Sequence, residues 1–450
     1  MKFIQTIKNI WRIEELRQRI LTTLGMVVIY RLGSYVVLPG VDTDKLSDFS
    51  SQSQDGILGI IDMFSGGAFH NASIFALGIM PYITASIIVQ LLGMAVPYFQ
   101  KMQKEGESGR KRMNQITRYL TVIVCALQAP GYIAGANQIS PGALPTDGFF
   151  WVSSTIILVA GTMFVMWLGE KITDRGLGNG ISLLIMIGII SRLPSALAME
   201  LASRLNNEGG GLVVFLLEMV VLLFIVITVI LLVQGTRRIP VQFAKKIVGN
   251  KQYGGNRQYI PLKVNAVGVM PIIFAQAIIL IPVYIIGYSQ VESGTLTGVA
   301  AAISDYTGFW HNFILAFLIL VFTYFYTAIM INPNQMAEEM KKNGGFIPGV
   351  KPGKKTAEFI DAVMSRITLP GALFLAFVAI LPSFAQMAGV KSQFAQFYGG
   401  TSLLILVGVV LDTLQQIESY LLMRHYDGLM KSGRIKGRTT NNQAPVSMAG

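Results

Sequence analysis

The sequence of 450 residues is 52% hydrophobic and only 13% charged, with a formal net charge of +12 and a mean hydropathy of +0.54. Soluble globular chains carry about a quarter of charged residues. A soluble chain of this length must also present a large polar surface to water, which this composition cannot supply. These values exclude an ordinary soluble enzyme or binding domain and predict that lipid surrounds much of the protein.

Ten apolar runs are long enough to cross the hydrocarbon core of a bilayer, which needs about 20 helical residues. In chain order they are residues 20–38, 72–96, 118–137, 150–169, 181–200, 212–234, 266–288, 309–331, 367–387 and 401–423. Several of them contain no Asp, Glu, Lys or Arg. We therefore expect an all-α polytopic membrane protein with ten transmembrane helices.

The basic residues indicate how these spans are oriented. Of the 36 Lys and Arg residues, 31 lie in the N-terminal segment, the loops after even-numbered spans and the C-terminal tail, whereas four lie in the opposite loops. Because cytoplasmic loops are enriched in Lys and Arg, both termini are predicted to be cytoplasmic. No small-residue cleavage site follows the first apolar run, so residues 20–38 are expected to be a retained anchor.

A shorter apolar stretch precedes the second span. Residues 57–69, ILGIIDMFSGGAF, are too few to cross the membrane and include the helix-weakening pair Gly66 and Gly67. Such a segment is either a re-entrant half-helix buried inside the protein or an interfacial helix on the outer membrane surface. Composition alone leaves both interpretations open.

Two loops, 235–264 and 332–366, are long for connectors and hold seven and six basic residues. A charge run is usually a solvated face, and a docking surface is the alternative. The stretch GGFIPGVKPGKK at 344–355 lacks the spacing of a phosphate-binding loop. Its Gly and Pro residues instead predict a tight turn that presents lysines to the cytosol.

The chain shows no pattern of catalytic or metal-binding residues. Its histidines lack ligand spacing, and the one cysteine excludes an internal disulfide, so neither a metal nor a cofactor is expected. The ionisable residues in or near the spans form no pair or cluster in the sequence, which disfavours a coupled transporter or a membrane enzyme. The residues concerned are His70, His311, His425 and Cys125 in the first group, and Arg31, Arg192, Glu218, His311, Asp412 and Glu418 in the second.

Five long motifs, spread in order over the whole chain, resemble the SecY family, whose members are channel subunits of the bacterial Sec translocon. They are MFSGGAFHNASIFALGIMPYITASIIVQLL (63–92), DRGLGNGISLL (174–184), PLKVNAVGVMPIIFA (261–275), FIPGVKPGKKTAEFID (346–361) and GGTSLLILVGVVLDT (399–413). The resemblance implies a channel in the bacterial inner membrane that conducts unfolded polypeptides and releases transmembrane segments sideways into lipid. It implies no enzymatic activity of its own.

The resemblance also implies a domain organisation. Two inverted halves of five spans, 20–205 and 206–423, would follow a cytoplasmic segment 1–19 and precede a cytoplasmic tail 424–450. The stretch 57–69 would be the plug that closes the outer funnel, which favours the buried alternative. Spans 2 and 3 would face spans 7 and 8 across a lateral gate.

The resemblance assigns roles to individual residues. The pore ring would be Ile79, Ile83, Ile181, Ile185, Ile273 and Ile405. The plug would include Ile57, Ile60, Ile61, Met63, Phe64, Ser65, Gly66 and Gly67, and the gate would include Thr84, Gln90, Asn265 and Gln276. On the sequence alone, isoleucines four apart are more often ordinary packing residues, and neutral amides in spans usually bond neighbouring helices.

The partners follow from the same resemblance. The basic loops would dock the SecA motor ATPase and the ribosome, because acidic grooves and RNA phosphates both attract cations. Further partners would be SecE-like and SecG-like subunits, signal sequences and nascent polypeptides, anionic lipids, and SecDF-like and YidC-like accessories. The docking candidates are Arg237, Arg238, Lys245, Lys246, Arg257 and Lys351. At Lys351 most family members carry arginine, and lysine lacks its planar bidentate bonding.

Overall fold

The computed structural model describes residues 11, 13–42, 56–145, 147–206, 210–243, 246–248, 251–253, 257–265, 267–276, 278–279, 305 and 307–431. Within these ranges most residues are helical, as expected. The helices are α2 (Glu14–Gly33), α4 (Gly56–Ser65), α5 (Met80–Ala95), α6 (Pro97–Lys104), α7 (Glu107–Ile139), α8 (Gly148–Arg175), α9 (Gly180–Leu205), α10 (Gly211–Gln234), α13 (Phe309–Met330), α14 (Pro333–Lys342), α15 (Lys354–Met387), α16 (Ser392–Ala395) and α17 (Gly400–Lys431), with a short 3₁₀ helix at Gln396–Tyr398. The strands are β1 (Thr236–Phe243), β2 (Lys246–Val248), β3 (Lys251–Tyr253), β4 (Arg257–Lys263) and β5 (Gly345–Phe346).

Seven helices of the described ranges are long and apolar enough to cross a membrane. They are α7, α8, α9, α10, α15, α17 and α13, which is counted together with α14. Helices α5 and α6, bent by 100° at their junction, add an eighth span if the pair is counted as one. The expected first span, α2, is not among the seven, and the expected run 266–288 is described only in part. The chain is a multi-pass membrane protein, and ten crossings stay a prediction.

Several helices begin or end away from the predicted span boundaries, among them α7, which begins at Glu107 rather than at 118. Helix α2 occupies 14–33 rather than 20–38. Helix α5 begins at Met80 rather than at 72, because residues 66–79 form turns in which Gly66, Gly67 and Gly78 adopt positive φ. Helix α15 begins at Lys354 rather than at 367, and its first turns bury an apolar face against the neighbouring loop.

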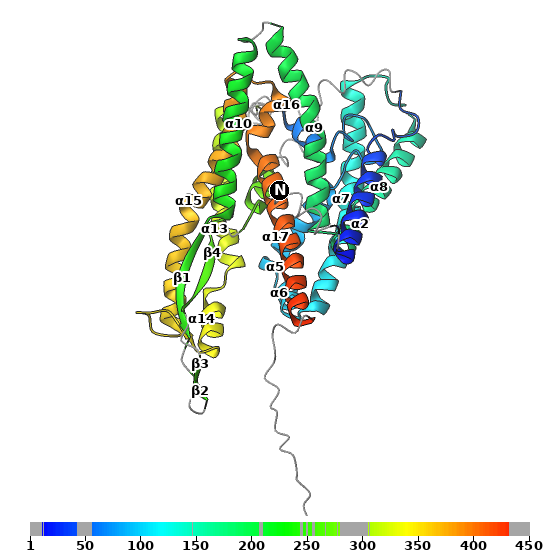
Figure 1. The fold of residues 1–450 in the computed structure, drawn as a ribbon. Coiled ribbons are helices and arrows are strands. Elements are labelled where there is room, and N and C mark those ends of the chain that lie inside the picture. Colours follow the sequence, from blue (N-terminus) through cyan, green and yellow to red (C-terminus); the bar gives the residue numbers. More distant parts are fainter. Residues whose placement is uncertain are drawn as a thin grey trace, which may run out of the picture.

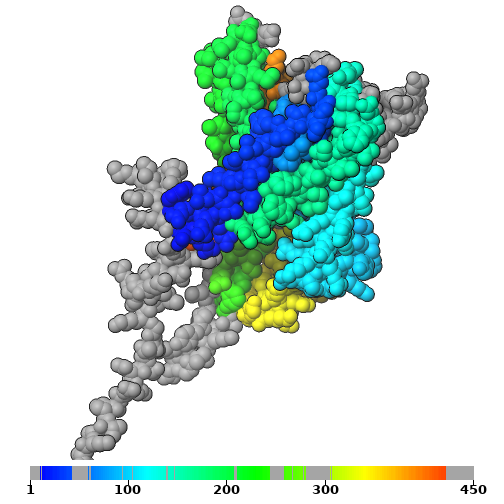
Figure 2. Space-filling model, turned by 90° about the vertical axis from the view of Figure 1, so that its right-hand side faces the viewer, coloured from blue at the N-terminus to red at the C-terminus, as the bar shows by residue number. Residues whose placement is uncertain are grey.

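The helices form two lateral groups with a central group between them. Figure 1 shows α2, α7 and α8 on one side, α10, α13 and α15 on the other, and α5, α9 and α17 in the middle. Helix α8 contacts α2, α7 and α9, while α17 contacts both α9 and α10. In Figure 2, α2 runs alongside α8. The central helices therefore have protein on both sides.

The two long basic loops lie together at the lower end of Figure 1. Their strands β1, β4 and β5, with α14 and the start of α15, form a small unit that we call the β1–β4 body. Strand β1 pairs antiparallel with β4 and β5, in the order β4-β1-β5, and β2 pairs with β3. Buried side chains of β1 and β4 pack against α14 and the start of α15, through Ile239, Leu262, Met340 and Ile360. The loops are therefore ordered structures that share one apolar core.

The connection between α8 and α9 is tied to helices from both ends of the chain. The backbone N–H of Leu177 donates to the Thr23 hydroxyl on α2, and that of Gly178 donates to Gln416 on α17, at 3.1 and 2.8 Å. The side chain of Asn179 accepts from the N–H groups of Ile181 and Ser182 and so caps α9. These bonds fix where α9 begins, and with it the first side chains of that helix.

Candidate functional site

Six isoleucines from four segments of the chain belong to one apolar cluster or pack against it. Ile79, Ile185 and Ile405 are buried in one apolar cluster, and Ile83, Ile181 and Ile273 pack against it at partial exposure. They come from the start of α5, the start of α9, the helical residues 270–276 and the start of α17. The structure thus brings together all six predicted ring residues, which we call the isoleucine cluster.

Helix α4 lies against this cluster. Met63 and Phe64 belong to the same apolar group as the buried isoleucines, and residues 62–69 are all buried. The expected helix within the protein is therefore confirmed against the alternative of a surface helix, although it ends at Ser65 and 66–69 are turns. The side chains of Ile57, Ile60 and Ile61 lie outside the described part of the chain.

Three glycines, Gly66, Gly67 and Gly188, shape the end of α4. Gly66 and Gly67 adopt φ of +66° and +92°, which ends the helix directly after Ser65. A Cβ atom built on Gly66 would lie 2.9 Å from the Cα atom of Gly188, so α4 and α9 are in backbone contact there. A residue with a side chain at Gly66 or at Gly188 would push α4 and α9 apart.

Polar side chains of two helices, α2 and α7, hold the residues around this turn. The Tyr30 hydroxyl on α2 donates to the carbonyl oxygen of Ser65 at 3.1 Å, and Arg31 Nη1 donates to that of Gly66 at 2.7 Å. On α7, the Tyr132 hydroxyl donates to the carbonyl oxygen of Phe69 at 2.7 Å. Because these bonds reach backbone atoms, they fix the segment independently of its side chains.

An ion pair links α4 to α9. The Asp62 carboxylate pairs with the Arg192 guanidinium, and its Oδ1 atom lies 2.9 Å from His70 Nδ1 and accepts from the His70 backbone N–H at 3.0 Å. The Asp62 side chain is 3% exposed and that of Arg192 19%. His70 lies outside the spans. Burial of the imidazole lowers the pKa of His70 to about 4.

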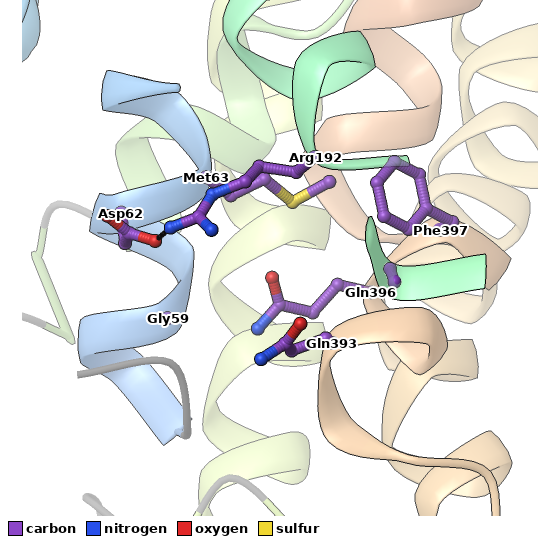
Figure 3. Close-up of a pocket in the computed structure, with 8 residues that line it drawn as sticks. Gly59, Asp62, Met63, Arg192, Gln393, Gln396 and Phe397 are labelled. Carbon is purple, nitrogen blue, oxygen red and sulfur yellow. Dashed lines mark ion pairs between the residues drawn. The ribbon is translucent and has the colours of Figure 1, made fainter. Parts of the chain in front are cut away.

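A pocket opens beside this ion pair. Asp62, Met63 and Gly59 line one wall, and Gln393, Gln396 and Phe397 line the opposite wall, with Arg192 and Ala196 completing it. Figure 3 shows the arginine reaching from α9 toward Asp62, and the two glutamine amides below it. The cavity volume is about 20 Å³. Water therefore has room next to the arginine.

A second charged cluster joins α9, α10 and the chain before α16. Arg204 Nε donates to Glu200 at 2.9 Å, and Arg204 Nη2 donates to Glu218 at 2.6 Å and to the carbonyl oxygen of Gly389 at 2.8 Å. Glu200 also accepts from the backbone N–H of Lys391. Glu218, which stands alone in the sequence of its span, is thus paired through residues distant in sequence.

The predicted gate residues do not form one group in the described structure. Thr84 and Gln90 bond within α5, to Met80 and Ser86. Gln276 accepts from the Thr401 hydroxyl at 3.2 Å, and Asn265 is buried. The contact between α5 and the segments opposite is apolar instead, through Ile87, Val267, Phe274 and Tyr326.

The docking candidates that can be placed lie on the surface of the β1–β4 body. Arg237 and Arg238 are exposed on β1, and Lys351 is exposed just before α15. Lys351 makes no ion pair among the described residues, whereas the neighbouring Lys355 pairs with Glu358 at 2.8 Å. That contact raises the pKa of Lys355. Lys245 and the side chains of Lys246 and Arg257 lie outside the described residues.

Sequence reasoning missed the Asp62–Arg192 pair and the role of Arg204. Asp62 is the one acidic residue in the apolar segment 57–69, and a buried carboxylate needs a cation close to it. The sequence could therefore have predicted a basic partner for Asp62, but not which residue it is. Within the residues described, no group of His, Cys, Asp and Glu could hold a metal ion. Cys125 is buried in the contact between α7 and α8, where its Sγ atom lies 3.4 Å from the Thr162 hydroxyl.

Comparisons with known proteins agree with one another. A family model described as SecY matches residues 73–414. Protein translocase subunit SecY of Streptomyces coelicolor is 43% identical over 431 residues, covering 93% of this chain and 97% of that protein. The proteins of the same name from Halalkalibacterium halodurans and Thermus thermophilus are 44% and 43% identical, covering 95% and 96% of this chain and 100% and 99% of theirs.

Solved structures with a similar fold include protein channels. A structure described as a protein conducting channel has a TM-score of 0.64 at 18% identity and covers 90% of this chain and 92% of that one. Sec61 in the canine ribosome-channel complex has a TM-score of 0.60 at 16% identity, covering 90% of this chain and 92% of its own. The yeast Ssh1 complex bound to the 80S ribosome scores 0.57 at 14% identity, covering 96% and 94%. These likenesses confirm the fold class.

Proposed function

Because the chain belongs to the SecY family, we propose that it is the channel subunit of a bacterial Sec translocon rather than an enzyme. It conducts unfolded polypeptides across the membrane and releases transmembrane segments sideways into lipid, and it needs no cofactor. The observation that supports this proposal is that six isoleucines from both halves of the chain belong to, or pack against, one apolar cluster that also contains Met63 and Phe64 of α4.

The isoleucine cluster acts as the pore ring of the closed channel. A collar of branched apolar side chains repels water and ions and can deform around an extended polypeptide. Helix α4, with Met63 and Phe64 on the cluster, acts as the plug. Opening then requires that α4 leave its site while the isoleucines separate.

The lateral gate lies between α5 and the segments at 267–279 and α13. The apolar contact of Ile87 with Val267, Phe274 and Tyr326 supports this place, because apolar side chains can exchange protein neighbours for lipid at little cost. Thr84, Gln90, Asn265 and Gln276 are neutral polar residues along the same segments. They are proposed to bond a passing signal sequence when the contact opens.

The β1–β4 body docks the SecA motor or the translating ribosome through Arg237, Arg238, Lys245, Lys246, Arg257 and Lys351. The ordered core beneath it supports this role, because a rigid basic surface loses little entropy on binding. The similar Sec61 and Ssh1 channels are ribosome-bound. SecE-like and SecG-like subunits, signal sequences, nascent chains and anionic lipids complete the partners, with SecDF-like and YidC-like accessories.

The excess of basic residues in alternate loops supports a bacterial inner-membrane protein with both termini in the cytoplasm. Within it, residues 20–205 and 206–423 are proposed to be the two inverted halves, between the cytoplasmic segments 1–19 and 424–450.

Reconstitution tests the function. The chain is purified with the small membrane proteins that accompany it and placed in vesicles with SecA, ATP and a secretory precursor. We expect protease-protected precursor inside the vesicles, and two small co-purifying subunits. Vesicles that accumulate a small solute but never protect the precursor would contradict the proposal and favour a transporter.

A further inference from the structure

We propose that the Asp62–Arg192 ion pair is a latch that sets how strong a signal sequence must be to open this channel. This inference rests on the proposed function and adds residues that determine the selectivity of opening. The latch consists of one carboxylate on α4, which must move, and one guanidinium on α9, which belongs to the channel wall.

The position of the pair supports this role. Asp62 is one turn from the end of α4, next to Met63 and Phe64 on the isoleucine cluster. Arg192 reaches it from the middle of α9, the helix whose first turns supply Ile181 and Ile185. Figure 3 shows the guanidinium bridging the space between the two helices. The pair therefore joins the closing element to a wall of the pore.

The charges around the pair make the closed position specific. Arg31 on α2 donates to the Gly66 carbonyl oxygen, so a second guanidinium group lies at the end of the helix that carries Asp62. The nearby His70 contacts both Asp62 and Arg192, and burial keeps it uncharged at neutral pH. When α4 leaves, the carboxylate leaves with it and two positive groups remain on α2 and α9. The arrangement thus favours return of α4.

The latch differs in kind from the apolar contacts of α4. Apolar contact is non-directional, so Met63 and Phe64 can slide over neighbouring side chains with small changes in free energy. The Asp62–Arg192 ion pair forms only when α4 is in its closed position, and a charged group that remains buried without its partner is strongly disfavoured. A signal sequence that binds the open state must offset this loss, and weak signals fail to do so.

The adjoining pocket explains how the latch can open at all. Gln393 and Gln396 line the same pocket as Arg192, and its cavity volume is about 20 Å³. That volume holds about one water molecule, and the space that Asp62 vacates adds to it, so water and the two glutamine amides can then bond the guanidinium. The open state is therefore costly but reachable.

The test compares precursors with an intact signal and with a shortened apolar core, exported by the reconstituted complex. Asp62→Asn keeps an acceptor for the His70 N–H but leaves Arg192 unpaired. We expect it to lower the ratio of intact to defective precursor export by about tenfold. The double variant Asp62→Asn with Arg192→Gln removes the unpaired charge and should recover part of the discrimination.

Controls separate the latch from general effects. Glu170→Gln breaks the Arg118–Glu170 ion pair between α7 and α8 and should leave discrimination unchanged. Arg192→Lys keeps the charge but loses the planar donor group, so an intermediate ratio is expected and gives a second, milder probe if Asp62→Asn does not fold.

The outcomes distinguish the two proposals. If the wild type exports intact precursor and the ratio is unchanged in both Asp62→Asn and Arg192→Lys, the latch is wrong and the channel function stands. A double variant more permissive than Asp62→Asn would also overturn the latch. If the wild-type complex exports nothing, the proposed function itself fails, and the latch with it.

Discussion

The hydroxyl of Tyr30 on α2 donates a hydrogen bond of 3.1 Å to the carbonyl oxygen of Ser65, the last residue of α4. Tyr30 is 2% exposed, so water cannot replace this bond in the closed state. Tyr30→Phe should cost about 1 kcal/mol, which is roughly a fivefold shift toward the displaced position of α4. Ion leak through reconstituted bilayers measures that shift.

The matched control is Tyr35→Phe, because Tyr35 is exposed on the same segment and its hydroxyl accepts from Arg31. Leak should stay at the wild-type level there. Equal leak in the Tyr30→Phe and Tyr35→Phe variants would mean that the bond to Ser65 does not hold α4.

Ile405→Asn tests the isoleucine cluster. Ile405 is 5% exposed among Ile79, Ile185 and the side chains of α4, and an amide there would hydrate an otherwise dry collar. We expect a higher resting ion leak and weaker rejection of defective signal sequences. Ile405→Val keeps the site apolar and should leave leak near the wild-type value. An unchanged leak in Ile405→Asn would remove this residue from the collar.

Lys351→Glu tests the docking surface. The Lys351 carbonyl oxygen accepts from the Thr356 hydroxyl at 3.0 Å, so the turn that presents this side chain is fixed. Reversal of an unpaired surface charge should weaken docking of SecA by about 1 kcal/mol, or roughly fivefold. Lys355→Glu should have a smaller effect, since Glu358 already neutralises Lys355. Equal losses in binding titrations would indicate that the loop acts through bulk charge alone.

Arg204→Met tests the cluster that joins α9 to α10. The change leaves Glu200 and Glu218 buried without their cation and should destabilise the protein by about 3–5 kcal/mol. Glu218→Gln leaves the Glu200–Arg204 pair intact and should cost about 1 kcal/mol or less. Heating the purified protein in detergent and measuring the soluble fraction compares the two. A similar loss in both variants would show that the cluster does not depend on Arg204.

The sequence predicts the features that depend on local composition. Apolar runs locate most of the long helices, because each must match the thickness of a bilayer. Gly66 and Gly67 correctly mark the end of the short helix, since both adopt conformations that other residues disfavour. The spacing of 79 with 83 and of 181 with 185 places isoleucines on common faces, although it cannot tell a pore from ordinary packing.

The features that depend on distant segments could not be predicted from patterns. Apolar residues at 72–79 look like the start of a span, yet they form buried turns surrounded by protein rather than lipid. Asp62 and Arg192 lie far apart in the chain, and so do Arg204 and Gly389. No sequence spacing could therefore predict these contacts. The early start of α15 had a local signal in Ala357, Ile360 and Met364, which are spaced along one helix face.

Crosslinking tests whether a polypeptide passes through the isoleucine cluster. A stalled secretory chain is engaged with a channel that carries Ile273→Cys, with Cys125→Ala to remove the native thiol. The control carries Ile156→Cys, whose position on α8 is 63% exposed on the outside of the helix group. We expect the secretory chain to crosslink to the cysteine at position 273 and not to the cysteine at position 156. An engaged chain that never crosslinks at 273 would contradict that expectation.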